Sequence, residues 1–154
     1  GAQPRVPVYS TEGGWLQLPV QTLVAESVAA RQAGFRGVKI KVGKPHVSED
    51  VARLRAVREA VGDDFELMVD ANQAFTVGEA IRRARHYEPL DLAWFEEPLA
   101  AVDLGGHVRL RVRLHDHQHP LDAGQERQIA VVAPGPRPRK TERRVAVVPQ
   151  GLRV

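Results

Sequence analysis

The sequence lacks several features that would assign a protein to a class at once. It contains no cysteine in 154 residues, which excludes a disulfide framework and a cysteine-based metal centre. No apolar run approaches the roughly 20 residues that a membrane-spanning helix needs. The segment Gly1–Arg5 lacks the apolar core of a signal peptide. We therefore expect a soluble protein without a membrane partner, in the reducing setting of the cytoplasm.

Aromatic residues are scarce, and the last third of the chain lacks them altogether. All eight lie at or before Phe95. The charge divides near the same place, because residues 1–104 have a net charge of −3 and residues 105–154 a net charge of +6. A segment this long without an aromatic side chain has little means to build a core. The sequence therefore predicts a folded domain over 1–104 and an atypical Arg/Pro-rich tail over 105–154.

Strand and helix signals alternate regularly through the first region. Apolar runs predict strands and helical spacing predicts helices, with strands over residues 6–10, 37–42, 65–70 and 92–96 and helices over 20–33, 48–61 and 76–87. Ser48 is a predicted N-cap, and Thr76 with Glu79 forms a capping box. Strict alternation favours a parallel sheet of right-handed crossover units. We predict an α/β fold with about four strand-plus-helix units of a TIM-type (β/α)8 barrel, which needs about 250 residues in full.

Charged and polar residues stand at the ends of three of these strands. They form the motifs Lys39-Ile40-Lys41, Asp70-Ala71-Asn72 and Glu96-Glu97-Pro98. Successive side chains of a strand point to opposite faces, so the two lysines share one face, as do Asp70 and Asn72. In a barrel whose aliphatic face packs on the helices, these polar side chains point inward. Inward charges at the carboxyl ends of parallel barrel strands are typical of a catalytic site.

The residue types in these motifs suit one kind of chemistry. Two neighbouring ammonium groups repel each other, and an enclosed site removes their water. Both effects lower the pKa of Lys39 and Lys41 and make each amine a better base. Asp70 and Glu96 offer the hard oxygen ligands that Mg²⁺ prefers. A lysine base beside Mg²⁺ suits removal of a proton next to a carboxylate, because the metal stabilises the dianionic enediolate that results.

In their order and spacing, the three motifs resemble those of the mandelate racemase and muconate lactonizing enzyme branch of the enolase superfamily. The resemblance covers residues 5–112. It implies a Mg²⁺-dependent racemase or dehydratase that takes the α-proton of a small-molecule carboxylate, an acid sugar or an α-hydroxy acid. The Gly13-Gly14-Trp15 loop favours the mandelate racemase and acid-sugar dehydratase side. A muconate cycloisomerase or a dipeptide epimerase is the alternative, and intact members are expected to form homo-oligomers.

The resemblance also implies a role for each polar residue of the motifs. Lys41 is the base, and Lys39 lowers the pKa of Lys41 and contacts the substrate carboxylate. The other implied roles are Mg²⁺ ligation by Asp70 and Glu96, hydrogen bonding to the substrate by Asn72, and support of the metal ligands by Glu97.

The chain departs from the family pattern in ways that limit its expected activity. The family has a capping domain before the barrel, a third carboxylate ligand on the next strand and often an Asp–His pair on later strands. After Glu97, the nearest counterpart of the third ligand is Ala123-Gly124-Gln125, with an amide in place of the carboxylate. We therefore expect a half-barrel fragment of such a racemase or dehydratase that is inactive on its own.

The tail reads unlike the sequence before it. Residues 107–114 alternate apolar and polar, mostly basic, side chains with a period of two where the order of units requires a helix, and Gly105-Gly106 is a poor helix start. Residues 134–140 are rich in Pro and basic residues and are predicted to be irregular or disordered, and 145–148 suit a short strand. The joint loss of aromatics, helical period and acidic residues suggests an out-of-frame or otherwise disrupted continuation.

Each motif also has a simpler interpretation. The two lysines suit the solvent face of an edge strand, and the Asp-Ala-Asn motif suits a turn. The Glu-Glu-Pro motif suits a strand end that proline terminates. Their joint occurrence at matching strand ends favours a shared site over three unrelated surface features.

The tail has interpretations of its own. His115, His117 and His119 alternate as they would in a metal-binding strand. The basic stretch suits nucleic-acid binding, which would make the chain a basic-tailed binding fragment without enzyme activity. Because the tail has no aromatic side chain to stack on bases, a solvated tail is favoured, and nucleic acid is not an expected partner.

Overall fold

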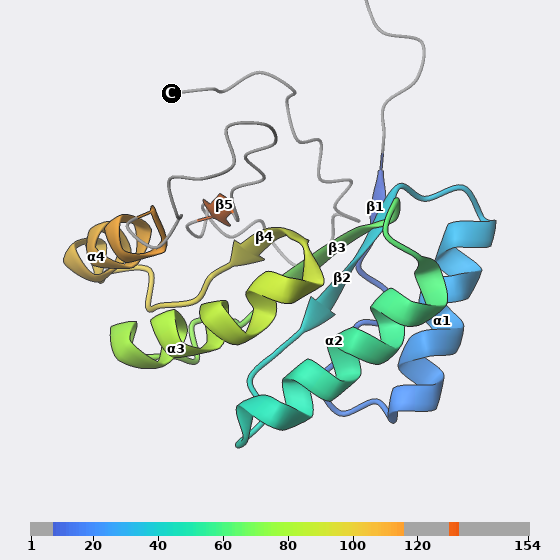
Figure 1. Ribbon diagram of the computed structural model, residues 1–154, viewed down its shortest axis with the longest axis horizontal. Coiled ribbons are helices and arrows are strands. Elements are labelled where there is room, and N and C mark those ends of the chain that lie inside the picture. Colours follow the sequence, from blue (N-terminus) through green and yellow to red (C-terminus); the bar gives the residue numbers. More distant parts are fainter. Residues whose placement is uncertain (1–7, 116–129, 133–154) are drawn as a thin grey trace, which may run out of the picture.

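The computed structural model describes residues 8–115 and 130–132. Its strands are β1 (Tyr9–Ser10), β2 (Gly37–Lys41), β3 (Glu66–Asp70), β4 (Leu92–Glu96) and β5 (Ala130–Val132). Its helices are α1 (Val20–Gln32), α2 (Val47–Val61), α3 (Val77–Tyr87), α4 (Leu104–His115) and the short 3-10 helix η1 (Glu88–Leu90). The strands form one parallel sheet in the order β1-β2-β3-β4-β5 (Figure 1). This order confirms the predicted α/β class and the partial (β/α)8 barrel.

Two helix starts show how local hydrogen bonds set the element bounds. Thr76 caps α3 as predicted, since its hydroxyl oxygen accepts a hydrogen bond from the backbone N–H of Glu79 at 3.3 Å. The predicted N-cap Ser48 is wrong by two residues. The cap of α2 is His46, whose backbone N–H donates to the carboxylate of Glu49 at 3.0 Å. Glu49, three residues after the cap, is therefore the second residue of the capping box, and Ser48 lies inside the first turn of the helix.

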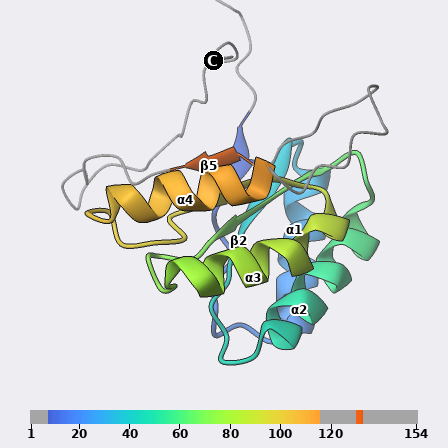
Figure 2. The ribbon, with the colours of Figure 1, turned by 60° about the vertical axis from the view of Figure 1, so that its left-hand side comes forward.

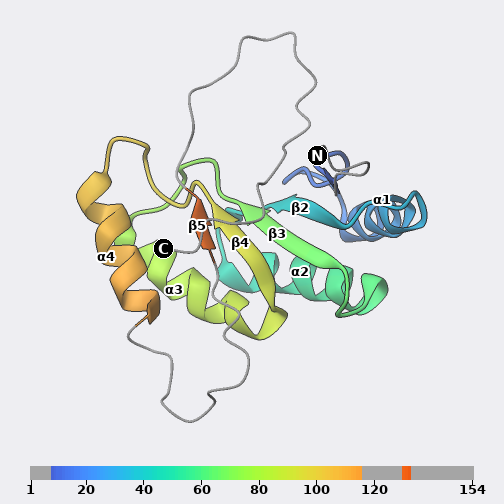
Figure 3. The ribbon, with the colours of Figure 1, turned by 90° about the horizontal axis from the view of Figure 1, so that it is seen from above.

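The main core lies between the sheet and the helices α1, α2 and α3. These helices cover one face of the strands (Figure 1), and the helices follow one another in chain order across the molecule (Figure 3). The aliphatic side chains of the strands point into this layer and are at most 2% exposed: Val38, Ile40, Leu67 and Val69. Burying each such side chain contributes about 1.5–3 kcal/mol. Because side chains alternate along a strand, the charged side chains of the same strands lie on the other face of the sheet.

The sheet curves so that this other face is concave. The rings of Tyr9 on β1 and Trp94 on β4 meet edge to face with centroids 5.1 Å apart. Neighbouring strands are spaced by about 4.8 Å, so a flat sheet would hold β1 and β4 roughly 14 Å apart. A ring contact across two intervening strands requires the sheet to close toward a barrel. The side chains on the concave face consequently converge.

Helix α4 corrects the sequence analysis, in which the alternation of apolar and polar residues disfavoured a helix. Asp103 fixes the start of α4, because its side chain accepts a hydrogen bond from the backbone N–H of Gly106 at 2.8 Å. Leu110 is fully buried and forms a second, small core with Ala80 and Leu99. Figures 2 and 3 both show α4 beside α3. Tertiary packing, rather than the local pattern, therefore determines the helix.

Part of the predicted irregular tail is thus regular structure. Strand β5 pairs in parallel with β4, so the prediction of irregular chain is wrong for α4 and β5. His115 is the last residue of α4 and is therefore not in a strand. The other predictions for the tail lie outside the described residues: His117 and His119 in a metal-binding strand, the motif 123–125, the basic stretch 134–140 and the strand 145–148. The disrupted frame stays a prediction. The predicted domain boundary stays a prediction. Within the described part, none of the helices has the length and apolar character to cross a membrane.

Candidate active site

The backbone register brings three charged residues side by side at the carboxyl ends of their strands. Lys41 pairs with Asp70 across β2 and β3, and Asp70 pairs with Glu96 across β3 and β4. Lys39 lies two residues before Lys41 and so has its side chain on the same face. Parallel strands in consecutive order place their carboxyl ends at one edge, which is where barrel enzymes collect catalytic groups.

These four side chains form one connected ion-pair cluster. The Lys39 Nζ lies 2.8 Å from a carboxylate oxygen of Glu96 and 3.4 Å from one of Asp70. The Lys41 Nζ lies 2.5 Å from the same Asp70 oxygen. The Asp70 side chain is only 4% exposed, whereas that of Lys41 is 20% exposed. The structure therefore brings together both lysines and both carboxylates that the sequence predicts, with Lys41 the more open of the two amines.

The charge of Lys39 follows from this arrangement. Burial lowers the pKa of Lys39, but the hydrogen bond and the charge of Glu96, together with the charge of Asp70, outweigh burial and leave that pKa above its ordinary value. The prediction of a lowered pKa for Lys39 is therefore wrong in this structure. The sequence reveals a neighbouring lysine, but it does not reveal how near the carboxylates come.

The two carboxylates also fit a hard divalent cation. Both lie within 3.4 Å of one ammonium nitrogen, so Asp70 and Glu96 are close enough to share a positive charge. Carboxylate oxygens are the ligands that Mg²⁺ prefers. Among residues 8–115 and 130–132, no group of three or more acidic or histidine side chains could hold a metal ion. The described residues thus place two carboxylates close together, fewer than the three side chains of such a group.

The residues after β3 and β4 adopt strained backbone conformations that link the two loops. Asn72, Gln73 and Glu97 all have positive φ values, of 48°, 65° and 45°. The backbone N–H of Asn72 donates to Asp70 at 2.9 Å, and the backbone N–H of Gln73 donates to the carbonyl oxygen of Glu97 at 2.7 Å. Such conformations persist where the surroundings enforce them, and they cluster at functional sites.

Gln73 is a residue of the site region that the sequence analysis missed. Its side-chain amide donates to the Glu97 carboxylate at 3.4 Å, and its amide oxygen accepts the backbone N–H of Ala101 at 3.0 Å. Glu97 therefore supports the loops through Gln73. The predicted substrate contact of Asn72 stays a prediction, and this side chain is exposed. The only signal for Gln73 was its position directly after the Asp-Ala-Asn motif.

The loop between β1 and α1 reaches the same end of the sheet. The carbonyl oxygen of Gly14 accepts the backbone N–H of Lys41 at 2.7 Å. A Cβ atom at Gly14 would lie 2.1 Å from the carbonyl oxygen of Lys39, so only glycine fits here. Arg53 on α2 holds the rest of the loop by donating to the carbonyl oxygens of Trp15 and Leu18. This anchoring leaves the Trp15 side chain half-exposed near the strand ends.

Known proteins share this sequence pattern. A family model described as enolase C-terminal domain-like matches residues 23–129. The L-talarate/galactarate dehydratase of Salmonella typhimurium is 48% identical over 109 residues, which are 71% of this chain and 27% of that enzyme. The 3,6-anhydro-alpha-L-galactonate cycloisomerase of Streptomyces coelicolor is 45% identical over 126 residues, which are 81% of this chain and 34% of that enzyme.

Solved structures share the fold as well. L-Talarate dehydratase from Polaromonas sp. JS666, complexed with Mg and L-glucarate, superposes with a TM-score of 0.69 at 42% identity, over 72% of this chain and 31% of that chain. A racemase from Streptomyces coelicolor A3(2) with bound magnesium gives a TM-score of 0.67 at 47% identity, over 70% of this chain and 32% of that chain. The chain thus spans 27–34% of the length of these four relatives.

Proposed function

We propose, since this chain belongs to the enolase superfamily, that the carboxyl ends of β2, β3 and β4 carry part of a site that removes the α-proton of a small carboxylate substrate with the help of Mg²⁺. The observation that carries the proposal is the cluster of Lys39, Lys41, Asp70 and Glu96 at one edge of the sheet. A base and two carboxylates in contact are among the groups that this chemistry requires.

The roles divide according to the position of each side chain. Lys41 is the more exposed amine, so its Nζ takes the α-proton from the substrate. Lys39 lies between the two carboxylates and binds the substrate carboxylate with its positive charge. Asp70 and Glu96 hold Mg²⁺, which when bound supplies positive charge to the substrate carboxylate as the α-proton leaves. Asn72 donates a hydrogen bond to a substrate hydroxyl, and Glu97 keeps the β4 loop in place.

The substrate class that we favour is an acid sugar. The L-talarate/galactarate dehydratase is the most similar of the two curated relatives described above, at 48% identity, and the Polaromonas structure contains L-glucarate. In a dehydratase, the electron pair of the broken C–H bond forms a C=C bond, and the β-hydroxyl group takes up a proton and leaves as water. A second candidate is a cycloisomerase, because a relative of that name is 45% identical over 126 residues. Such an enzyme rearranges its substrate without losing water, so the products distinguish the two.

Within the described residues, Lys41 is the proposed base, and Asp70 and Glu96 are the two proposed metal ligands. Two protein ligands hold Mg²⁺ weakly. We therefore expect proton exchange at the α-carbon without detectable product, because dehydration or racemisation also needs a group on the opposite side of the substrate.

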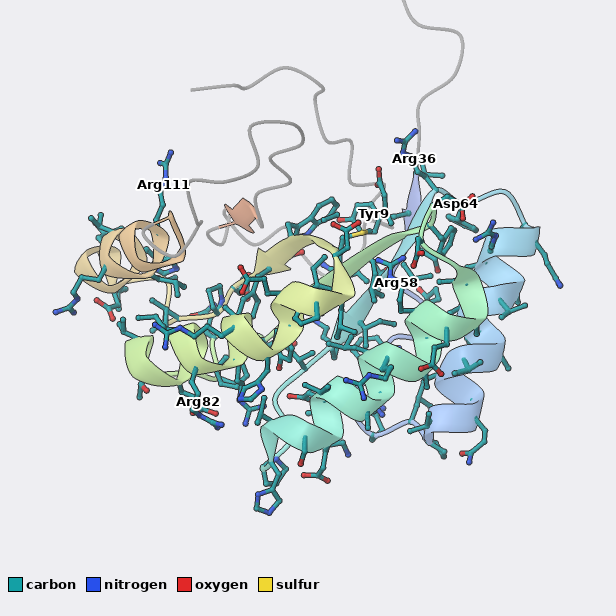
Figure 4. The ribbon with its side chains drawn as sticks, in the orientation of Figure 1. Tyr9, Arg36, Arg58, Asp64, Arg82 and Arg111 are labelled. Atoms are coloured by element: carbon teal, nitrogen blue, oxygen red, sulfur yellow. The ribbon has the colours of Figure 1, made fainter. Side chains whose placement is uncertain are left out.

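Deuterium exchange tests the proposal directly. The full chain is incubated with Mg²⁺ and galactarate or L-glucarate in deuterated buffer, and proton NMR follows the α-proton. We expect slow Mg²⁺-dependent exchange that Lys41→Ala abolishes. Arg36→Ala removes an exposed cation just before the start of β2, at the opposite end of the strand (Figure 4), and should exchange like the wild type. Equal exchange in Lys41→Ala, or none in the wild type, would contradict the proposed role of Lys41.

A further inference from the structure

A buried charged cluster contacts the loop that follows the proposed base. Asp50 on α2 is 0% exposed, and the Arg83 side chain on α3 is 4% exposed. The Arg83 Nη1 lies 2.5 Å from an Asp50 oxygen, and the hydroxyl of Tyr87 donates to the same oxygen at 3.1 Å. The Arg83 guanidinium also lies over the ring of Phe75, 4.6 Å from its centroid. None of these residues has a role in the chemistry proposed above.

This cluster binds the backbone of the loop that follows Lys41. The carboxylate of Asp50 accepts the backbone N–H groups of Gly43 at 2.9 Å and Lys44 at 3.2 Å. Arg83 Nη2 donates to the carbonyl oxygens of Lys44 at 2.8 Å and Pro45 at 3.3 Å. Asp50 therefore binds the N–H groups of this loop while Arg83 binds its carbonyl oxygens. The planar fork of a guanidinium suits this because its N–H groups have a fixed geometry.

Stability alone is a weak reason for such a pair. Moving two charges out of water costs several kcal/mol, and apolar replacements of similar volume are often neutral or stabilising. The loop that the pair holds begins one residue after Lys41, whose amine requires a defined direction. Gly43 in this loop has a φ of +126°, which other residues rarely adopt. Hydrogen bonds that fix this loop also restrict the backbone of Lys41, the last residue of β2.

We propose that Arg83, acting through Asp50 and the loop of residues 42–46, is a positioning residue that fixes the direction of the Lys41 amine beside Asp70. The inference rests on the proposed function of Lys41 as the base. Arg83 touches neither substrate nor metal in this account. It acts by holding a loop at the catalytic end of the sheet.

Arg58 offers a matched control at the other end of the sheet. It is also a buried arginine, 9% exposed, and it donates to backbone carbonyl oxygens between 2.6 and 3.2 Å away, those of Gly62, Phe65, Leu90 and Asp91. Figure 4 shows Arg58 toward the same end as Arg36 and Asp64, away from the carboxyl ends of the strands. The two arginines share burial and backbone hydrogen bonding, but only Arg83 holds the loop after Lys41.

The test compares Arg83→Lys with Arg58→Lys in the full chain. Lysine keeps the charge but cannot reach Asp50 and two carbonyl oxygens together. For Arg83→Lys we expect α-proton exchange of L-glucarate to fall roughly 10-fold to 100-fold, with the half-saturating L-glucarate concentration nearly unchanged. The amide hydrogens of Gly43 and Lys44 should exchange at least about 10-fold faster. Arg58→Lys should unfold more easily yet exchange the α-proton at the wild-type rate per folded molecule.

A second set of readouts separates this inference from the proposed function. If the wild type exchanges no α-proton, the proposed function fails. Two other measurements then decide the inference. They are the rate at which trinitrobenzenesulfonate labels Lys41 and the hydrogen-exchange rates of the Gly43 and Lys44 amides. Labelling and amide exchange in Arg83→Lys that match the wild type would overturn the inference, as would unchanged α-proton exchange. Should Arg83→Lys not fold, the double variant Asp50→Leu with Arg83→Met removes both charges and is measured in the same way.

Discussion

At the scale of single residues, the charged side chains of the site are held mainly by one another. Lys39 and Lys41 both contact Asp70, and Lys39 also contacts Glu96. Substituting either carboxylate removes a candidate metal ligand and leaves a part-buried ammonium group with fewer partners. The consequences for stability and for metal binding are therefore coupled at these positions. Residues outside the cluster give a cleaner view of individual interactions.

Glu79 on α3 is such a residue, and its ionisation predicts a dependence of stability on pH. Hydrogen bonds from Arg82 and Arg83 lower the pKa of Glu79 from 4.5 to about 2. Since the folded pKa lies below the unfolded one, the stabilisation is complete above about pH 4.5 and is lost as the pH falls toward about 2. Glu79→Gln should therefore be less stable than the wild type near pH 6, and this difference should shrink on acidification.

Urea unfolding at several pH values measures this difference. Glu59→Gln on α2 is the control, because Glu59 is a helical glutamate that is exposed, whereas the Glu79 side chain is 29% exposed. A loss of stability in Glu79→Gln that stays constant from about pH 6 to about pH 3 would show that the arginines do not act through the carboxylate charge.

At the scale of elements, α4 is where local pattern and tertiary structure disagree. The alternation of apolar and polar residues is a strand-like signal, yet the helix forms because Asp103 caps it and Leu110 packs against α3. The strand motifs were predictable because side-chain parity on a strand depends on nothing beyond the strand. The helix was not, because its stabilising contacts come from residues such as Ala80, far away in sequence.

Substitutions on α4 test this explanation. Leu110→Ala removes a fully buried side chain and should cost about 2–5 kcal/mol of unfolding free energy. Val108 is 64% exposed on the same helix, so Val108→Ala should change the unfolding free energy by less than about 0.5 kcal/mol. Equal costs for the two variants in urea unfolding would mean that α4 does not pack on α3 through Leu110.

At the scale of the whole molecule, a curved parallel sheet gathers groups that are far apart in the chain. The contact of Tyr9 with Trp94 records the curvature, and the same concave face presents the lysines and carboxylates. The sequence predicted this gathering because each motif lay at a strand end. It missed Gln73 and Arg83, since their importance lies in hydrogen bonds to loops that only the folded chain brings near. It also misjudged the pKa of Lys39 for the same reason.

The measurement that tests the central claim most directly is the location of a bound divalent cation by NMR spectroscopy. Mn²⁺ takes the same oxygen ligands as Mg²⁺ and broadens nearby amide signals in NMR spectra. We expect broadening to centre on Asp70 and Glu96, to leave Arg36 and Asp64 at the opposite end of the sheet unaffected, and to disappear in Asp70→Asn. Broadening centred elsewhere in the molecule, or broadening that persists unchanged in Asp70→Asn, would contradict the assignment of the site.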